Sequence, residues 1–213
     1  MDTIKSKYHE TLAATVIKNL EKRQMEGYYC PTVEDAEKLA FSFLKDGQTV
    51  SFGGSMTLEE TGMLTALRHD PSIHLIDRST AKTPDETKKM YHDALSSDVY
   101  FMSTNAITTG GELVNIDGTG NRVAALIYGP ETVVILAGMN KIAANVDEAL
   151  SRVHNVATAQ NCIRLDKKTP CAITGACADC LSPDCICNQV VITRRSGIKG
   201  RIKVLLIGES FAY

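Results

Sequence analysis

The sequence predicts an α/β fold in which helices cover both faces of a mostly parallel sheet. Short β-rich runs, flanked by Gly, Pro or polar residues, alternate with segments that have helical patterns. This alternation is typical of parallel sheets, whose ligand crevice lies beyond the carboxyl ends of the strands. The chain has 213 residues, of which 44% are hydrophobic, so it is long enough for one sizeable core. We therefore expect a single α/β domain over residues 1–213.

Four helices are predicted in the first half of the chain. The first, which is expected to end near Gly27, has an apolar stripe with a four-residue repeat: Ile4, Tyr8, Leu12, Val16 and Leu20. Three others begin at N-cap threonines that each have an acidic residue three positions on, namely Thr32, Thr57 and Thr83. Pro84 supports the last of these, because proline is favoured at the first helical position.

Strands and one more helix complete the predicted order. The β-rich runs are 28–30, 48–52, 74–77, 98–102 and 132–138. An amphipathic helix is predicted at 146–157, a cysteine-rich segment follows at 162–188, and two final strands lie at 189–195 and 201–209. The cysteine-rich segment is therefore expected to be an insertion that precedes the last strands of the sheet.

Charge and hydropathy exclude two classes of partner. Lys and Arg number 23 against 25 Asp and Glu, so no excess of positive charge attracts nucleic acid. No run reaches the roughly 18 apolar residues of a spanning helix, and the first residues lack the apolar stretch of a signal peptide. We expect a cytoplasmic protein, in which thiols stay reduced and clustered cysteines are metal ligands or redox groups.

Five cysteines fall within seventeen positions: Cys171, Cys177, Cys180, Cys185 and Cys187. Two thiolates separated by two residues can bind one metal, because a tight turn brings both sulfurs to it. Four thiolates suit a tetrahedral zinc or a four-iron cluster, and the spacing does not choose between them. The alternative is a set of buried, unligated cysteines. Cys30 and Cys162 are expected in the core, and the five scattered histidines at the surface or as caps.

A first glycine-rich loop is a candidate anion site. Gly53, Gly54 and Ser55 lie between a strand and the helix predicted to begin at Thr57. Free backbone N–H groups at such a place can bind a phosphate or a carboxylate. A tight turn without any ligand explains the same residues equally well.

A second polar, glycine-rich loop contributes further candidate binding residues: Thr109, Gly110, Gly111, Asn115 and Asp117. Glu112, beside two glycines, is a candidate general base or carboxylate nucleophile. Asp117 and Gly118 alternatively form a turn between two strands. Lys141 follows a predicted strand, where it is either a cation that completes an anion site or a solvated surface lysine.

Four segments together resemble the lactate utilization (LUD) domain family: FGGSMTLEETG, TGGELVNIDGTGNRVAALIYGP, VVILAGMNKI and TPC-x5-C-x2-C-x6-C-N. The resemblance runs from about residue 8 to residue 208. It implies a fold similar to the sugar-phosphate isomerase, CoA-transferase and formyltetrahydrofolate cyclo-ligase superfamily. In this family a basic residue usually takes the position of Cys185. The resemblance therefore implies four metal ligands: Cys171, Cys177, Cys180 and Cys187.

The resemblance favours a redox or accessory protein of lactate or organic-acid utilization that carries an iron–sulfur cluster. Its partners would be other subunits of an oxidoreductase complex or a second copy of the chain. A different interpretation is an enzyme or sensor that binds a small anionic metabolite, such as a sugar phosphate, an acyl-CoA or a hydroxy acid, with a structural zinc or no metal. A third is a structural partner protein whose cysteines only staple a loop.

Overall fold

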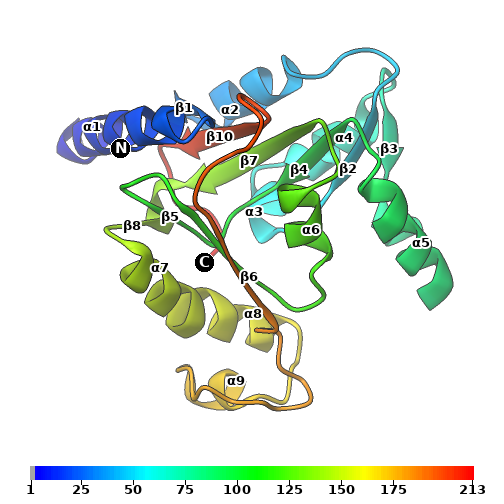
Figure 1. Cartoon of the computed structure of the whole chain (residues 1–213), viewed down its shortest axis with the longest axis vertical. Coiled ribbons are helices and arrows are strands. Elements are labelled where there is room, and N and C mark those ends of the chain that lie inside the picture. The colour runs from blue at the N-terminus through cyan, green and yellow to red at the C-terminus, as the bar shows by residue number, and fades with distance from the viewer. Residues whose placement is uncertain (1–2) are drawn as a thin grey trace.

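The computed structural model describes residues 3–213 and has the predicted α/β architecture (Figure 1). Its main sheet has six strands in the order β1-β10-β7-β4-β2-β3, and every neighbouring pair is parallel. Each β-rich run of the first 138 residues forms one of these strands. The strands are β1 (Glu26–Cys30), β2 (Thr49–Phe52), β3 (His74–Ile76), β4 (Val99–Met102), β7 (Thr132–Gly138) and β10 (Ile202–Ile207).

Helices pack against both faces of the main sheet, as predicted. Side chains alternate along β7, so Val133 and Ile135 enter one core cluster while Val134 and Leu136 enter another. The short helix α5 (Pro84–Ala94) lies beside β2 and β3 at one edge. The first cluster includes α1 (Thr3–Lys22) and α6 (Asn121–Ile127), and the second includes α2 (Val33–Phe41), α3 (Met56–Glu60) and α4 (Met63–His69).

A second, smaller sheet packs on the same face as α1. Its order is β8-β5-β6-β9, with β8 (Ile142–Ala143), β5 (Ala106–Thr108), β6 (Leu113–Asp117) and β9 (Gln189–Thr193). Ile107 and Leu113 point into the first core cluster, whereas Ala106 and Val114 point away from it into a third cluster. β9 pairs antiparallel with β6, so of the two strands predicted after the cysteine-rich segment only β10 joins the main sheet.

The amphipathic helix predicted at 146–157 is present and is longer than expected. α7 (Val146–Arg152) continues through a π-helical turn (Val153–Thr158) into α8 (Ala159–Arg164), and its apolar side covers the outer face of the small sheet. α9 (Pro170–Thr174) follows, and residues 175–188 then form an irregular loop that leads to β9. α9 and this loop lie beyond α8 (Figure 1), so the cysteine-rich segment forms an outer layer.

Two details of the predicted helix starts and turns differ. Thr32 and Thr83 cap α2 and α5 as predicted, because each hydroxyl accepts the N–H of the residue three positions on. The prediction of Thr57 as an N-cap is wrong, since Ser55 caps α3 and Thr57 is fully buried within it. A turn at Asp117 between two strands is also wrong, because β6 is followed directly by α6.

The buried face of α1 differs from the predicted stripe. Ile4 and Tyr8 are 80% and 61% exposed, because a four-residue repeat advances about 40° per step around a helix of 3.6 residues per turn. The helix ends at Lys22, before Gly27, which lies in β1. The buried residues of α1 are Ala13, Val16, Leu20 and His9, the last of which was expected at the surface or as a cap.

No helix within residues 3–213 combines the length and apolar character of a membrane span.

Candidate functional site

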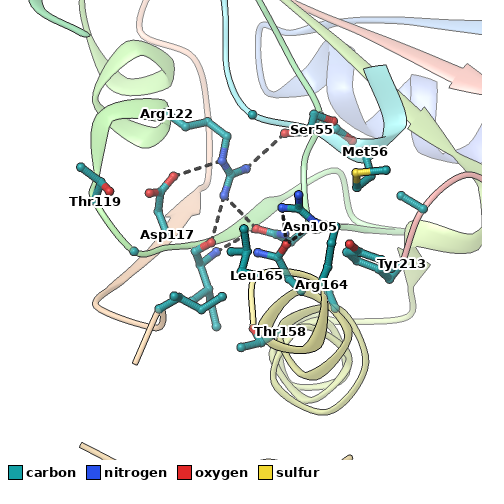
Figure 2. Close-up of a pocket in the computed structure, with 18 of the residues that line it drawn as sticks. Ser55, Met56, Asn105, Asp117, Thr119, Arg122, Thr158, Arg164, Leu165 and Tyr213 are labelled. Carbon is teal, nitrogen blue, oxygen red and sulfur yellow. Dashed lines mark hydrogen bonds and ion pairs between the residues drawn. The ribbon is translucent and has the colours of Figure 1, made fainter. Parts of the chain in front are cut away.

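A cavity of about 480 Å³ lies at the carboxyl edge of the main sheet (Figure 2). Residues 54–57 after β2, residues 103–105 after β4 and Lys141 after β7 line one side of it. The chain passes from β2 outward to β3 and returns to β4 on the other side of β2, so the strand order reverses here. Open α/β sheets bind ligands at such a point. The opposite wall comes from α8 and the cysteine-rich segment, including Arg164 and Cys185.

Three basic side chains of the cavity have no acidic partner. Arg78, Arg164 and Lys167 line it, and none of them forms an ion pair with a carboxylate in the described part of the chain. Arg78 donates instead to the hydroxyl of Tyr91 at 3.3 Å, and Arg164 donates to Oδ1 of Asn161 at 2.7 Å. These neutral partners leave the positive charges uncompensated, so the cavity favours an anion.

Arg122 holds the loop after β4 against β6 (Figure 2). Its Nε donates to Oδ2 of Asp117 at 3.0 Å, Nη1 to Oδ1 of Asn115 at 2.6 Å, and Nη2 to Oδ1 of Asn105 at 3.0 Å. Two backbone carbonyls, one in each segment, also accept from it. Asp184, another carboxylate of the lining, accepts a backbone N–H at 3.0 Å. Arg122 therefore positions the wall of the cavity instead of offering a free charge to it.

Lys141 is buried at the end of β7, with 4% of its surface exposed, so it is not a solvated surface lysine. Its Nζ donates to Oγ1 of Thr57 at 2.8 Å and to Oγ of Ser103 at 3.1 Å. Burial lowers the pKa of Lys141, and the nearby charges of Arg152 and Arg122 add to this effect, so that the pKa falls to about 7. The amine thus exchanges its proton close to neutral pH.

The first glycine-rich loop reaches the cavity, and two of its groups already bond within the protein. The N–H of Gly53 donates to the carbonyl of Phe101 at 2.9 Å, and Ser55 uses its hydroxyl to cap α3. α3 has five residues, so its dipole is small. Gly54 contributes in another way: a side chain there would place its first carbon 2.1 Å from Nη2 of Arg78. Glycine at this position allows the guanidinium to lie over the loop.

The second glycine-rich loop is divided between two places. Asp117 lines the cavity at the end of β6, and Asn115 lies just behind the lining through its bond to Arg122. Residues 109–112 form the turn between β5 and β6, where Gly111 packs against the backbone of α1 with a φ of 87°. The carboxylate of Glu112 forms an ion pair with Arg23, which lies between α1 and β1. The structure therefore does not bring Glu112 to the cavity.

The two cysteines expected in the core are there: Cys30 and Cys162 are 2% and 1% exposed. Cys162 packs against Cys171, the first cysteine of the motif, whose sulfur lies 3.2 Å from Oγ1 of Thr169. Burial raises the pKa of the Cys162 thiol, and the adjacent Cys171 thiol also raises it. All seven cysteines are free thiols, so the segment contains no disulfide.

Other cysteines of the motif lie on the irregular loop after α9. Sγ of Cys177 lies 3.6 Å from Nδ1 of His154 in the π-helical turn. Sγ of Cys185 accepts the backbone N–H of Cys187 at 3.3 Å, and Cys185 also lines the cavity. Burial, together with the thiols of Cys185 and Cys162, raises the pKa of Cys187 to about 12. The thiol of Cys187 is therefore protonated at neutral pH.

The four cysteines that the resemblance implies as metal ligands lie apart from one another in the described structure. Within residues 3–213, no three His, Cys, Asp or Glu side chains converge on a point that could hold a metal ion. Of the four predicted ligands, Cys171 and Cys187 adjoin other thiols, Cys177 adjoins a histidine, and Cys180 is half-buried on the loop. In this arrangement the four sulfurs are not gathered around one point.

The family profile of the LUD domain matches residues 13–207. The chain belongs to the LUD domain family. Among solved structures, this LUD domain is similar to a DUF162 family protein from Deinococcus radiodurans, with a TM-score of 0.53 and 11% identity over 93% of this chain and 98% of that chain. The similarity shows a shared fold. No curated protein matches the chain.

Further structural similarities cover about half of the LUD domain. eIF2B delta from Chaetomium thermophilum matches 52% of this chain and 48% of that chain, with 20% identity and a TM-score of 0.35. Ribose 5-phosphate isomerase from Plasmodium falciparum matches 53% of this chain and 52% of that chain, with 16% identity and a TM-score of 0.33. These two folds are therefore among the structural neighbours of the LUD domain.

Sequence reasoning missed several residues that line the cavity of this LUD domain. Ser103 and Asn105 follow β4, and polar residues at the carboxyl end of a predicted strand are a signal that could have found them. Arg78 follows β3 and gives the same signal. Arg164 and Lys167 come from α8 and the loop after it, and no local pattern indicates that this helix lies opposite the strands.

Proposed function

We propose that this LUD domain binds a small organic anion, with a carboxylate or phosphate group, in the cavity at the carboxyl edge of the main sheet. The proposal rests on three cations that line this one cavity: Arg78, Arg164 and Lys167. None of them forms an ion pair with a carboxylate among residues 3–213. A cavity of about 480 Å³ is within the range that holds a small metabolite. Hydroxyl and amide groups from both walls supply further hydrogen bonds, among them Ser55 and Asn161.

The chemical class of the ligand follows from these contacts. Guanidinium groups bind carboxylates and phosphates through paired hydrogen bonds, which a neutral ligand cannot reproduce. Lactate and other hydroxy acids, sugar phosphates and acyl-CoA esters all present such a group. The LUD family resemblance favours the organic acids, so we assign the chain to lactate or organic-acid utilization, either as an enzyme or as a sensor of the metabolite.

Replacing Arg164 or Arg78 with glutamine is expected to weaken anion binding about tenfold to a hundredfold, because each charge-assisted hydrogen bond contributes about 1.5–3 kcal/mol. Isothermal titration calorimetry with lactate, pyruvate, ribose 5-phosphate and inorganic phosphate measures the change. Arg195→Gln is the matched control, because Arg195 is exposed and lies outside the cavity. Equal affinities in Arg164→Gln, Arg78→Gln and the control would contradict the proposal.

A second proposal concerns the cysteines. We infer that the four family-pattern cysteines, Cys171, Cys177, Cys180 and Cys187, hold an iron–sulfur cluster, or alternatively zinc, in the metal-bound protein. Five free cysteines within seventeen positions support it. We also propose a cytoplasmic location, in which thiols stay reduced. The irregular loop of residues 175–188 would have to rearrange on binding, which metal sites coupled to folding commonly do. The partners would be other subunits of an oxidoreductase complex or a second copy.

Protein purified without oxygen is expected to contain iron and acid-labile sulfide and to absorb visible light. Substituting Ser at both Cys177 and Cys180 is expected to remove the metal, because both thiolates of the pair are lost. Cys30→Ser is the control, since Cys30 lies in the core beneath α2, apart from the motif. Elemental analysis checks the prediction: stoichiometric zinc selects the alternative, and metal-free protein from an iron-supplemented, oxygen-free preparation would contradict both.

A further inference from the structure

Lys141 differs from the other cations of the cavity because its amine is enclosed. It lines the cavity, yet 4% of its surface is exposed. The neighbours of Nζ are the hydroxyl groups of Thr57 and Ser103. Each hydroxyl can accept a hydrogen bond from an ammonium or donate a hydrogen bond to a neutral amine. Among residues 3–213, no carboxylate lies within ion-pair distance of Nζ. The immediate contacts therefore do not hold the amine in its charged form.

Charges on the surrounding helices also act on this amine. Arg122 of α6 and Arg152 of α7 disfavour a third positive charge, and Glu60 of α3 opposes them. With burial, these charges bring the pKa of Lys141 to about 7, so a large share of the amine is neutral at neutral pH. A lysine with an ordinary pKa is neutral in fewer than about one molecule in a thousand. Lys141 is thus a nucleophile beside an anion-binding surface.

We propose that Lys141 condenses with the aldehyde or ketone group of a small anion to form a Schiff base. This inference rests on the proposed anion-binding function, because Arg78, Arg164 and Lys167 would hold the carboxylate or phosphate of the same molecule. The substrate class is a small aldehyde or ketone that carries an acidic group, such as a 2-oxo acid or an open-chain sugar phosphate. Lysines enclosed in apolar or cationic surroundings are activated for this reaction.

The reaction balances without any co-reactant except a proton from solvent. The lone pair of the neutral Nζ forms a bond to the carbonyl carbon, the carbonyl π pair moves to oxygen, and one proton passes from nitrogen to that oxygen. A second proton, taken up from solvent, lets the oxygen leave as water, so that a carbonyl, a lysine amine and one proton give a protonated imine and water. The hydroxyls of Thr57 and Ser103, which contact Nζ, can accept a hydrogen bond from the protonated imine.

The hydroxyl of Tyr213 provides an independent sign of a ligand in this cavity. It is buried and has no hydrogen-bond partner in the part of the chain that the structure describes, and Tyr213 lines the same cavity (Figure 2). A buried hydroxyl without a partner is unfavourable. An oxygen atom of a bound carbonyl anion would accept a hydrogen bond from this hydroxyl and so give it a partner.

Reductive trapping tests the inference on the full chain. Pyruvate, glyoxylate and ribose 5-phosphate are incubated separately with the protein and sodium cyanoborohydride at pH 7, and labelled lysines are located by peptide mass spectrometry. The first two probes carry a carboxylate and the third a phosphate, so the arms distinguish the acidic group. We expect Lys141 to be labelled about a hundredfold faster than Lys22, an exposed lysine of α1, because its neutral fraction is larger.

Two further results decide between this inference and the one on which it rests. Inorganic phosphate and Arg164→Gln are both expected to slow labelling of Lys141 and to leave Lys22 unchanged. Labelling of Lys141 no faster than Lys22 with all three probes would overturn the Schiff base. A thermal-shift measurement with lactate and with inorganic phosphate, neither of which has an aldehyde or ketone, then separates the proposals: stabilisation by either anion leaves anion binding intact, and stabilisation by neither removes both.

Discussion

Arg122→Ala is expected to lower the free energy of unfolding by about 3–5 kcal/mol, because it leaves a buried charge without its partner. The guanidinium pairs with Asp117 and bonds the side chains of Asn105 and Asn115. The side chains of Arg122 and Asp117 are 12% and 9% exposed, so water replaces the lost donors poorly. The variant also frees the loop that carries Ser103, and we therefore expect weaker anion binding as well as lower stability.

Urea unfolding followed by circular dichroism measures this loss. Arg68→Ala is the matched control, because Arg68 forms a similar ion pair with Asp77 but its side chain is 35% exposed. The side chain of Asp77 is 11% exposed, so this pair lies only partly at the surface and is expected to contribute less than the buried pair of Arg122. The stability of Arg122→Lys is expected to fall between those of the two alanine variants, since a lysine keeps the charge but has three donors where the guanidinium makes five hydrogen bonds. If Arg122→Ala were no less stable than Arg68→Ala, the network would not hold the wall of the cavity.

The strands of the main sheet were predictable because they are buried on both faces and have clear ends. β7 alternates between two core clusters and is flanked by polar residues, so length and composition suffice to find it. The family motifs were equally informative, and the family profile confirms the resemblance over residues 13–207. The small sheet was missed as a separate unit, because β9 reads as a strand in isolation and only its pairing with β6 assigns it to another sheet.

The site was predictable where polar residues directly follow a strand and unpredictable where distant segments meet. Lys141 and Ser55 follow β7 and β2, and both reach the cavity. Glu112 also lies beside glycines in a polar loop, which made it a candidate in the sequence. The tight turn after β5 directs its side chain toward Arg23 instead of the cavity. The wall that carries Arg164 depends on how α7 and the π-helical turn pack on the small sheet and how α8 packs against the cysteine-rich segment, which are tertiary contacts without a local signal.

Lys141→Met is expected to change the dependence of stability on pH. The pKa of Lys141 is about 7 in the folded chain and near its ordinary value of 10.5 when unfolded. Between these values the unfolded chain binds more protons, so rising pH stabilises the wild type. From pH 6 to pH 10 the free energy of unfolding of the wild type should therefore rise by about 4 kcal/mol relative to Lys141→Met. Below pH 7 the variant is the more stable protein, because it buries no charge.

Urea unfolding of both proteins at pH 6, 7, 8, 9 and 10 measures this difference, in which titrations common to the two proteins cancel. Arg122, Arg152 and Glu60, whose charges act on the amine, are present in both proteins. Lys22→Met is the control, and its difference from the wild type should not vary with pH, since Lys22 is exposed. A pH-independent difference for Lys141→Met would mean that the amine stays charged in the folded protein, and Lys141 would then be an anion-binding cation without nucleophilic character.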